Sequence, residues 1–492
     1  MKKSLFKKVT AVFLTFALLA SIGGCGSKGK GGSADGSEEQ TTITLLVNYD
    51  LKNEIDSILP TFNELHPEIK VELMDTDSGV GDTPTALSKL AAAGNLPDVA
   101  FGVENFAFIL SQGLAYPLDN LYANDPDKEN ALQAGVDNYT YGGHLYAMPW
   151  RVQFNTIQVN QSLLDTLNLD DPGYEWTIEE FINLCKKATT NEYSGINIVT
   201  SSDNTHELST KLMGGMLEAP LQMYGYNFET NQFNFTNGAW TKSIEIVEEL
   251  QSVPGLISDE LKDNDKRNQG IADAYELKFG GSADALLAGK VLFGNHNSWD
   301  TGWINKGVNF EWDIYPVPTA EGLEQRIQTH VDYCFILSSC PEEKAEAAYE
   351  LVKFLSYEEE GCKARIDYRK TKLETSSIYT PASADPDVLE YYGQEGYAKD
   401  GLVYCLETIS KDPEKIFIAD ANKLVPNFWN DVNTYLEQVE TQIDSGSDPT
   451  SLAKDFENKC NMAAGETWAN FEKKLEKYLD EFYASHPGEK AE

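Results

Sequence analysis

The fold is decided by residues 43–73, which read ITLLVNYDLKNEIDSILPTFNELHPEIKVEL. Apolar residues alternate over 43–47, recur with helical spacing over 51–65, and alternate again over 69–73. Alternation predicts a strand, whereas a spacing of three to four residues predicts a helix. The stretch is therefore a β-α-β unit, and repeated units of this kind build an α/β fold with a parallel sheet covered by helices on both faces.

The same pattern continues beyond this unit. Thr83 as N-cap and Pro84 at the first helical position predict a helix that ends at Gly94, and residues 98–101 predict the next strand. Because ligands of such sheets bind beyond the carboxyl ends of the strands, the loops 48–50 and 102–106 are the predicted binding loops.

Further elements are predicted along the rest of the chain. Thr177 and Glu180 form a capping box, and Trp176 and Phe181 a hydrophobic staple, at the start of a helix. The apolar stripe of a C-terminal helix over 467–483 is predicted to face the core. Strands are predicted over 290–294, 310–316 and 331–337, and helices over 240–251 and 342–355.

The N-terminus has the features of an export signal. Four lysines within the first eight residues precede an apolar run over 9–20 that is too short to span a bilayer. Cys25 follows a Gly-Gly pair and resembles the modified cysteine of a bacterial lipobox. We expect residues 1–24 to be a signal peptide, Cys25 to carry the lipid, and residues 25–42 to be the anchor and a flexible linker. The alternative is a secretory peptide with an incidental cysteine.

Charge narrows the range of partners. Removing residues 1–24 takes away four of the 39 basic residues and none of the 78 acidic ones, so the mature chain has a formal charge of −43. Phosphate binding needs clustered Lys and Arg, so this composition argues against nucleic acid and polyanions as partners.

The motifs for catalysis and metal binding are absent from the sequence. It contains no phosphate-binding loop, no nucleophile elbow and no HExxH zinc pair. The acidic clusters near Asp75 and Asp263 lack the glutamate of a calcium loop, so no metal or cofactor is expected, and a structural calcium stays open. The cysteines do not form a metal motif, and a bridge between Cys334 and Cys340 also stays open.

Two tryptophans in polar surroundings are the strongest candidates for ligand contact. Trp299 lies within Asn295-His296-Asn297-Ser298-Trp299-Asp300, and Trp429 precedes a predicted helix. An indole beside hydrogen-bonding groups suits a small-molecule cleft, although packing at the core edge would explain either residue.

The order of segments is similar to that of the extracellular solute-binding proteins of ABC sugar importers, the family of maltose-binding protein. The similar segments are residues 91–99, 143–150, 159–160, 176–181, 287–290 followed by 297–299, 312–318 and 348–356. The resemblance implies a two-lobed periplasmic-binding-protein fold of type II, in which each lobe is a sheet flanked by helices and hinge crossovers join the lobes. Lobe one would comprise 43–150 and 331–370, and lobe two 151–330 and 371–492, with crossovers near 150–151, 330–333 and 367–378. Residues 256–284 would be an insertion.

The resemblance also implies a function and a set of binding residues. The chain would be a monomeric, non-enzymatic lipoprotein outside the cytoplasmic membrane that binds a mono- or oligosaccharide by hinge closure and delivers it to an ABC permease. A surface glycan hydrolase and a binding protein for a peptide or charged metabolite are the alternatives. The implied ligand-binding residues are Tyr49, Asp50, Glu104, Asn105, Arg151, Trp299, Asp300 and Trp429.

Overall fold

The computed structural model describes residues 40–196, 202–218, 221–254, 256 and 286–489. The chain divides into two units, residues 1–39 and 40–492, and the following description concerns the second unit. The predicted signal peptide, the lipidation site Cys25, most of the predicted linker and most of the 256–284 insertion lie outside the described residues.

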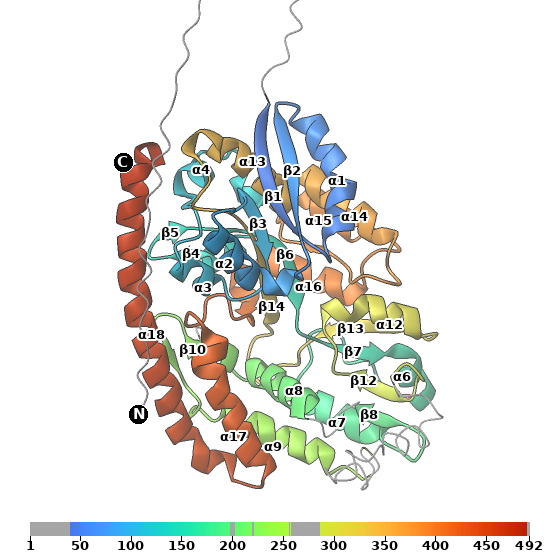
Figure 1. The fold of residues 1–492 in the computed structure, drawn as a ribbon. Helices are drawn as coiled ribbons and strands as arrows, with labels where there is room; N and C mark the ends of the chain where they lie inside the picture. The colour runs from blue at the N-terminus through green and yellow to red at the C-terminus, as the bar shows by residue number, and fades with distance from the viewer. Residues whose placement is uncertain (1–39, 197–201, 219–220, 255, 257–285, 490–492) are drawn as a thin grey trace, which may run out of the picture. The chain divides into compact units, whose positions relative to one another are not determined.

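The β-α-β unit that the sequence predicts lies at one edge of a seven-stranded sheet (Figure 1). Its order is β15-β6-β14-β3-β1-β2, and β16 pairs with β14 off this path. The strands are β1 (Thr41–Asn48), β2 (Ile69–Thr76), β3 (Val99–Gly102), β6 (Met148–Phe154), β14 (Ile327–Ile336), β15 (Thr380–Pro381) and β16 (Ile416–Ile418).

The predicted parallel pairing is confirmed for the first three strands. β1 pairs in parallel with β2 and with β3, and α1 (Lys52–Leu65) connects β1 to β2. The sheet is nevertheless mixed, because β14 enters antiparallel between β3 and β6. Helix α2 (Thr83–Ala93) ends at Gly94, whose left-handed φ of 67° favours glycine. The predicted N-cap is wrong by one residue: a short 3-10 turn precedes Thr83, whose hydroxyl donates to the carbonyl of Val80, and Asp82 takes the cap position.

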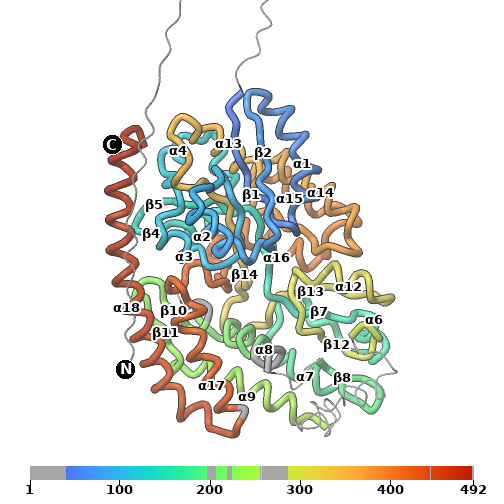
Figure 2. The backbone as a smooth tube through the Cα atoms, viewed as in Figure 1, coloured from blue at the N-terminus to red at the C-terminus, as the bar shows by residue number. Residues whose placement is uncertain are grey.

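Helices cover the sheet and enclose one large core (Figure 2). The strand β3 is buried along its whole length, as expected of a central strand with helices on both faces. In addition to α1 and α2, the helices around this sheet are α3 (Phe106–Ser111), α4 (Asp119–Asn124), α5 (Gln133–Asn138), α13 (Ala345–Ser356), α14 (Glu359–Lys370), α15 (Pro386–Tyr392) and α16 (Asp400–Lys411).

A second sheet of four strands has its own core. Its order is β13-β7-β12-β8, with the predicted strand β13 at the edge. The predicted capping box of α7 is confirmed, and the rings of Trp176 and Phe181 lie 5.7 Å apart. The elements are β7 (Thr156–Asn160), β8 (Ser194–Ile196), β12 (Val291–Gly294), β13 (Trp312–Pro316), α6 (Gln161–Leu167), α7 (Ile178–Ala188), α8 (Ser202–Gly215), α9 (Ala239–Gln251) and α12 (Thr301–Gly307).

A third cluster of buried residues joins the C-terminal helices to a small sheet. The predicted core stripe of α18 is confirmed at Phe471, Leu475 and Phe482, which are buried in the core of the larger sheet. The elements of this region are β9 (Leu221–Gln222), β10 (Tyr226–Asn227), β11 (Gln232–Phe233), the π-helical turn η7 (Trp429–Asn433), α17 (Thr434–Asp444) and α18 (Pro449–Ser485).

The chain passes between the two larger sheets at short connections. Asn155 alone separates β6 from β7, and residues 317–326 lead from β13 back to β14. Residues 371–492 are predicted to belong to lobe two. Their strands β15 and β16 pair within the seven-stranded sheet, whereas Gly401 of their helix α16 donates its N–H to Asp313 of β13 in the four-stranded sheet. The predicted lobe boundaries stay a prediction.

The six cysteines after Cys25 are free and buried in the structure, Cys334 and Cys340 among them. Along the described part of the chain, none of the helices combines the length and apolar character needed to cross a bilayer.

Candidate ligand-binding site

A cavity of about 580 Å³ lies among α8, β14, α17 and the segments around Trp299 and Trp429. This volume falls within the roughly 300–1,000 Å³ of typical small-molecule sites. Its wall combines aromatic rings with amide, hydroxyl and charged groups, so it can bury apolar surface and orient a ligand by hydrogen bonds.

Trp299 enters the cavity from a short turn that follows β12. Asn297 and Asp300 close this turn with reciprocal hydrogen bonds between side chain and backbone, which is a capping box. The indole is 37% exposed, and its ring meets the ring of His330 edge to face at 5.1 Å. The turn therefore holds a partly exposed tryptophan in the cavity wall, where an indole can stack on a ligand.

Trp429 enters from the C-terminal region. Asn427 adopts a left-handed φ of 63°, which Asn tolerates better than most residues, and the side chain of Asn430 donates to its Oδ1 at 2.6 Å. The bend sends Phe428 into the core, where it lies 5.7 Å from Tyr224, while Trp429 stays 37% exposed in the cavity wall.

A chain of polar side chains joins Trp299 to the connection between the two sheets. His330 Nε2 lies 2.9 Å from Asn155 Oδ1, and Asn155 Nδ2 donates to Gln328 Oε1 at 3.1 Å. Burial, with the nearby charge of Lys211, lowers the pKa of His330 to about 4. His330 is therefore neutral at neutral pH, and its Nε2 carries the proton because an amide oxygen can only accept.

Lys211 is a buried cation in the wall of the cavity. Its ammonium donates to Asn295 Oδ1 at 2.8 Å and to the Thr156 carbonyl at 3.1 Å, and Glu207 Oε1 lies 3.2 Å away. Burial lowers the pKa of Lys211, and Glu207 opposes this shift. The side chain of Asn297 donates to the same Glu207 oxygen at 2.5 Å.

Of the eight residues predicted to bind ligand, the structure brings two, Trp299 and Trp429, together in this cavity. Six others do not line it: Tyr49, Asp50, Glu104, Asn105, Arg151 and Asp300. Ligand contact by any of the eight stays a prediction.

The two predicted binding loops of the seven-stranded sheet contribute no residue to the cavity wall. Tyr49 is 65% exposed, whereas Asp50 accepts a hydrogen bond from the Val80 backbone N–H at 3.2 Å. Asn105 has a left-handed φ of 60° and precedes α3. Burial and the charge of Asp332 raise the pKa of Glu104.

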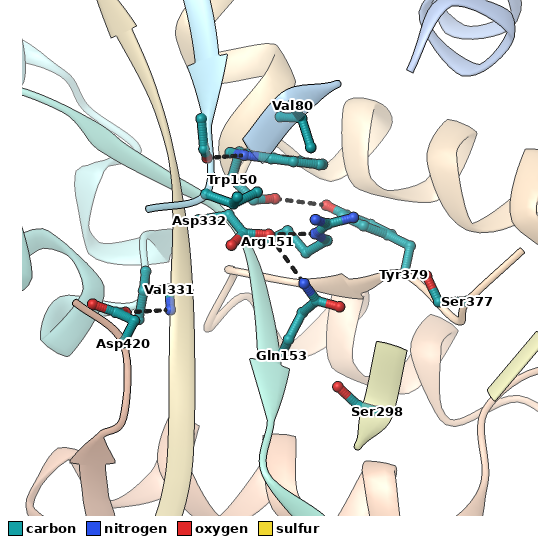
Figure 3. A network of polar contacts seen from close by, with 12 residues as sticks. Val80, Trp150, Arg151, Gln153, Ser298, Val331, Asp332, Ser377, Tyr379 and Asp420 are labelled. Atoms are coloured by element: carbon teal, nitrogen blue, oxygen red, sulfur yellow. Dashed lines mark hydrogen bonds and ion pairs between the residues drawn. The ribbon is translucent and has the colours of Figure 1, made fainter. Parts of the chain in front are cut away.

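Arg151 and Asp300 already have partners. The Arg151 guanidinium pairs with Asp332 and lies 4.4 Å from the centroid of the Trp150 ring (Figure 3). Burial raises the pKa of Asp332 to about 6 even though Arg151 opposes the shift. Asp300 caps the Trp299 turn, and its carboxylate lies 3.5 Å from His296.

Several residues of the cavity wall were not predicted from the sequence, among them Asn155, Lys211, Tyr224, Gln328 and His330. Of these residues, only Lys211 could be recognised from its neighbours in the sequence. It lies three residues after the buried Leu208 and therefore on the buried face of α8. The others converge from distant segments, which local periodicity cannot reveal.

The described residues bring together no group of three His, Cys, Asp or Glu side chains that could hold a metal ion. The donors and acceptors of the cavity wall are instead suited to hydrogen bonding.

Comparison with known proteins identifies the family. The family model of bacterial extracellular solute-binding proteins matches residues 49–361, which is more than half of the chain. The chain belongs to this family. No curated protein matches this solute-binding protein at a significant level.

Solved structures of this family share the fold at low identity. An ABC substrate-binding protein from Listeria monocytogenes, in complex with cycloalternan, is 18% identical with a TM-score of 0.60, and the match covers 87% of this chain and 99% of that one. The sugar-binding protein MalE from Xanthomonas citri is 13% identical with a TM-score of 0.63, covering 88% and 99%. The cyclic alpha-maltosyl-1,6-maltose binding protein from Arthrobacter globiformis is 14% identical with a TM-score of 0.62, covering 87% and 100%. The predicted α/β fold of the type II binding proteins is confirmed.

Proposed function

We propose that this solute-binding protein captures a mono- or oligosaccharide in the cavity and delivers it to an ABC permease. The observation that carries the proposal is the pair of half-exposed tryptophans, Trp299 and Trp429, that face one cavity rich in hydrogen-bonding groups. Indole rings stack on the apolar faces of sugar rings, while amide and charged groups bind hydroxyls. Sugar ligands are named for the similar structures from Listeria, Xanthomonas and Arthrobacter, which supports the same ligand class here.

Capture proceeds by hinge closure. The connection at Asn155 joins the two larger sheets, and Asn155 bonds to both His330 and Gln328 in the cavity wall. A ligand that contacts both lobes only in the closed form shifts the population toward closure. The exposed Tyr49 and the loop of Glu104 are the proposed contacts from the seven-stranded sheet.

A thermal-shift screen against mono- and oligosaccharides and short peptides tests the ligand class. A ligand at 100 times its Kd stabilises the folded state by about 2.7 kcal/mol, so a binding sugar raises the melting temperature measurably. Shifts with peptides alone would overturn the sugar assignment. Release of reducing sugar from a bound glycan would instead show a hydrolase.

The lipid anchor at Cys25 is part of the proposal. Two acyl chains hold a protein at a membrane far more firmly than one, so a diacylated Cys25 would keep the cavity close to the permease. Labelling cells with a radioactive fatty acid tests this: the label should appear on the wild type and disappear in Cys25→Ala. Equal labelling of both proteins would contradict the anchor.

A further inference from the structure

Hydrogen bonds with a fixed direction connect helix α8 to His330 in the cavity wall. Gln328 Nε2 donates to the backbone carbonyl of Lys211 at 2.6 Å, and Asn155 Nδ2 donates to Gln328 Oε1 at 3.1 Å. His330 Nε2 lies 2.9 Å from Asn155 Oδ1 at the end of this series.

The backbone carbonyl of Lys211 decides the orientation of each amide that follows. A carbonyl oxygen only accepts, so Gln328 must direct its NH2 group to Lys211 and its oxygen to Asn155. Asn155 must then direct its own NH2 group to Gln328 and its oxygen to His330. A Cβ at Gly214 would lie 2.5 Å from Gln328 Nε2, so the glycine leaves the room that this amide needs.

These bonds fix the tautomer of His330. Its Nε2 faces an acceptor and therefore carries the proton. Burial and the charge of Lys211 lower the pKa of the ring to about 4, so the ring is neutral at neutral pH. In a neutral imidazole with the proton on Nε2, the other nitrogen, Nδ1, can only accept a hydrogen bond.

The Nδ1 atom of His330 opens on the cavity. Within the described part of the chain no hydrogen bond reaches this atom, and it is not fully buried. His330 lines the cavity, and its ring lies 5.1 Å from the ring of Trp299. The cavity therefore presents an unpaired acceptor beside the aromatic surface of Trp299, and only a ligand group that donates can pair with it.

From the fixed hydrogen bonds and this acceptor we infer that His330 is a specificity-determining residue, whose Nδ1 accepts a hydrogen bond from one hydroxyl of the sugar that stacks on Trp299. The inference rests on the proposed sugar-binding function. A sugar in which an ether or a fluorine replaces this hydroxyl cannot donate and would face the Nδ1 lone pair instead. Gln328 and Asn155 are positioning residues in this role, because they act through the tautomer of His330.

The tautomer is measured first, in the full mature chain without ligand. Side-chain 15N NMR of protein labelled at its six histidines distinguishes protonated from unprotonated ring nitrogens, and the signals absent from His330→Phe belong to His330. At neutral pH, Nδ1 should be unprotonated and Nε2 protonated. A proton on Nδ1 would overturn the inference and leave sugar binding intact.

The same signals are followed when sugar is added. Calorimetry with D-glucose, D-xylose, maltotriose, cellotriose and xylotriose identifies the sugar among them that binds most tightly. At saturation this sugar should move the Nδ1 signal of His330 toward that of a hydrogen-bonded nitrogen. Binding with an unmoved Nδ1 signal overturns the inference alone, whereas if none of these sugars binds, both the inference and the sugar-binding function fail.

A variant tests how much the acceptor contributes. His330→Phe keeps an aromatic ring beside Trp299 but removes the acceptor, so it should weaken binding of the same sugar at least about tenfold. His66→Phe is the matched control, because His66 is also half-buried and stacks on Phe62 at 4.8 Å, but does not line the cavity. Its Kd should stay within about twofold of the wild type. An unchanged Kd in His330→Phe, or an equal loss in His66→Phe, would refute the contact.

Fluorinated sugars test the selectivity for a donor. Among the monodeoxyfluoro derivatives of the same sugar, one position should lose about tenfold in affinity for the wild type and nothing further for His330→Phe, because the hydroxyl and the acceptor form one interaction. Losses that are the same in both proteins at every position would overturn the inference.

Discussion

Replacing Trp299 by alanine should weaken sugar binding by about 2 kcal/mol, or roughly 30-fold in Kd. The side chain is 37% exposed, and a tryptophan side chain carries roughly 250 Å² of surface, so about 90 Å² is left for a ligand to cover. At about 25 cal/mol per Å² this area is worth about 2 kcal/mol. The contact between His330 and Trp299 is lost as well, so the variant needs a folding check.

Isothermal titration calorimetry with the best oligosaccharide from the thermal-shift screen measures this loss, and circular dichroism confirms that the variant is folded. Trp303→Ala is the matched control, because Trp303 is also exposed, at 46%, but does not line the cavity. Its Kd should stay within twofold of the wild type. An unchanged Kd in a folded Trp299→Ala, or an equal loss in Trp303→Ala, would refute the stacking argument.

Three further predictions concern stability, each measured by denaturant unfolding. Glu54→Gln should lower the free energy of unfolding by about 3–5 kcal/mol, because it leaves the buried guanidinium groups of Arg365 and Arg369 without their carboxylate. A decrease of less than about 1 kcal/mol would contradict this prediction. Gly401→Ala should cost at least about 1–3 kcal/mol, because its Cβ would clash with a backbone carbonyl of β13, and wild-type stability would refute the clash. Burial raises the pKa of Asp420 from 3.8 to about 7, so the folded state binds the extra proton between these values and stability falls as the pH rises through them. Asp420→Asn should flatten this decline by up to about 1.4 kcal/mol per pH unit; an unchanged slope would contradict the assignment.

The local elements were predictable because their causes are local. The Thr177–Glu180 capping box, the end of α2 at Gly94 and the first β-α-β unit each depend on residues within one or two turns, and the structure confirms all three. The N-cap of α2 was missed because the preceding 3-10 turn uses the hydroxyl of Thr83 instead.

The candidate site was predictable only in part. Trp299 and Trp429 were predicted because a tryptophan surrounded by polar residues can be identified from the sequence alone. Lys211, Tyr224 and His330 were not, since each looks ordinary beside its chain neighbours and becomes significant through partners far away in sequence.

The sequence by itself determined the class of the protein: an α/β chain with a strongly acidic composition and the segment order of a solute-binding protein. Only the tertiary structure decided which of these side chains share a cavity. The reason is physical: periodicity and capping act over a few residues, whereas the cavity brings Glu207, Trp299 and Glu440 together from segments that only packing places side by side.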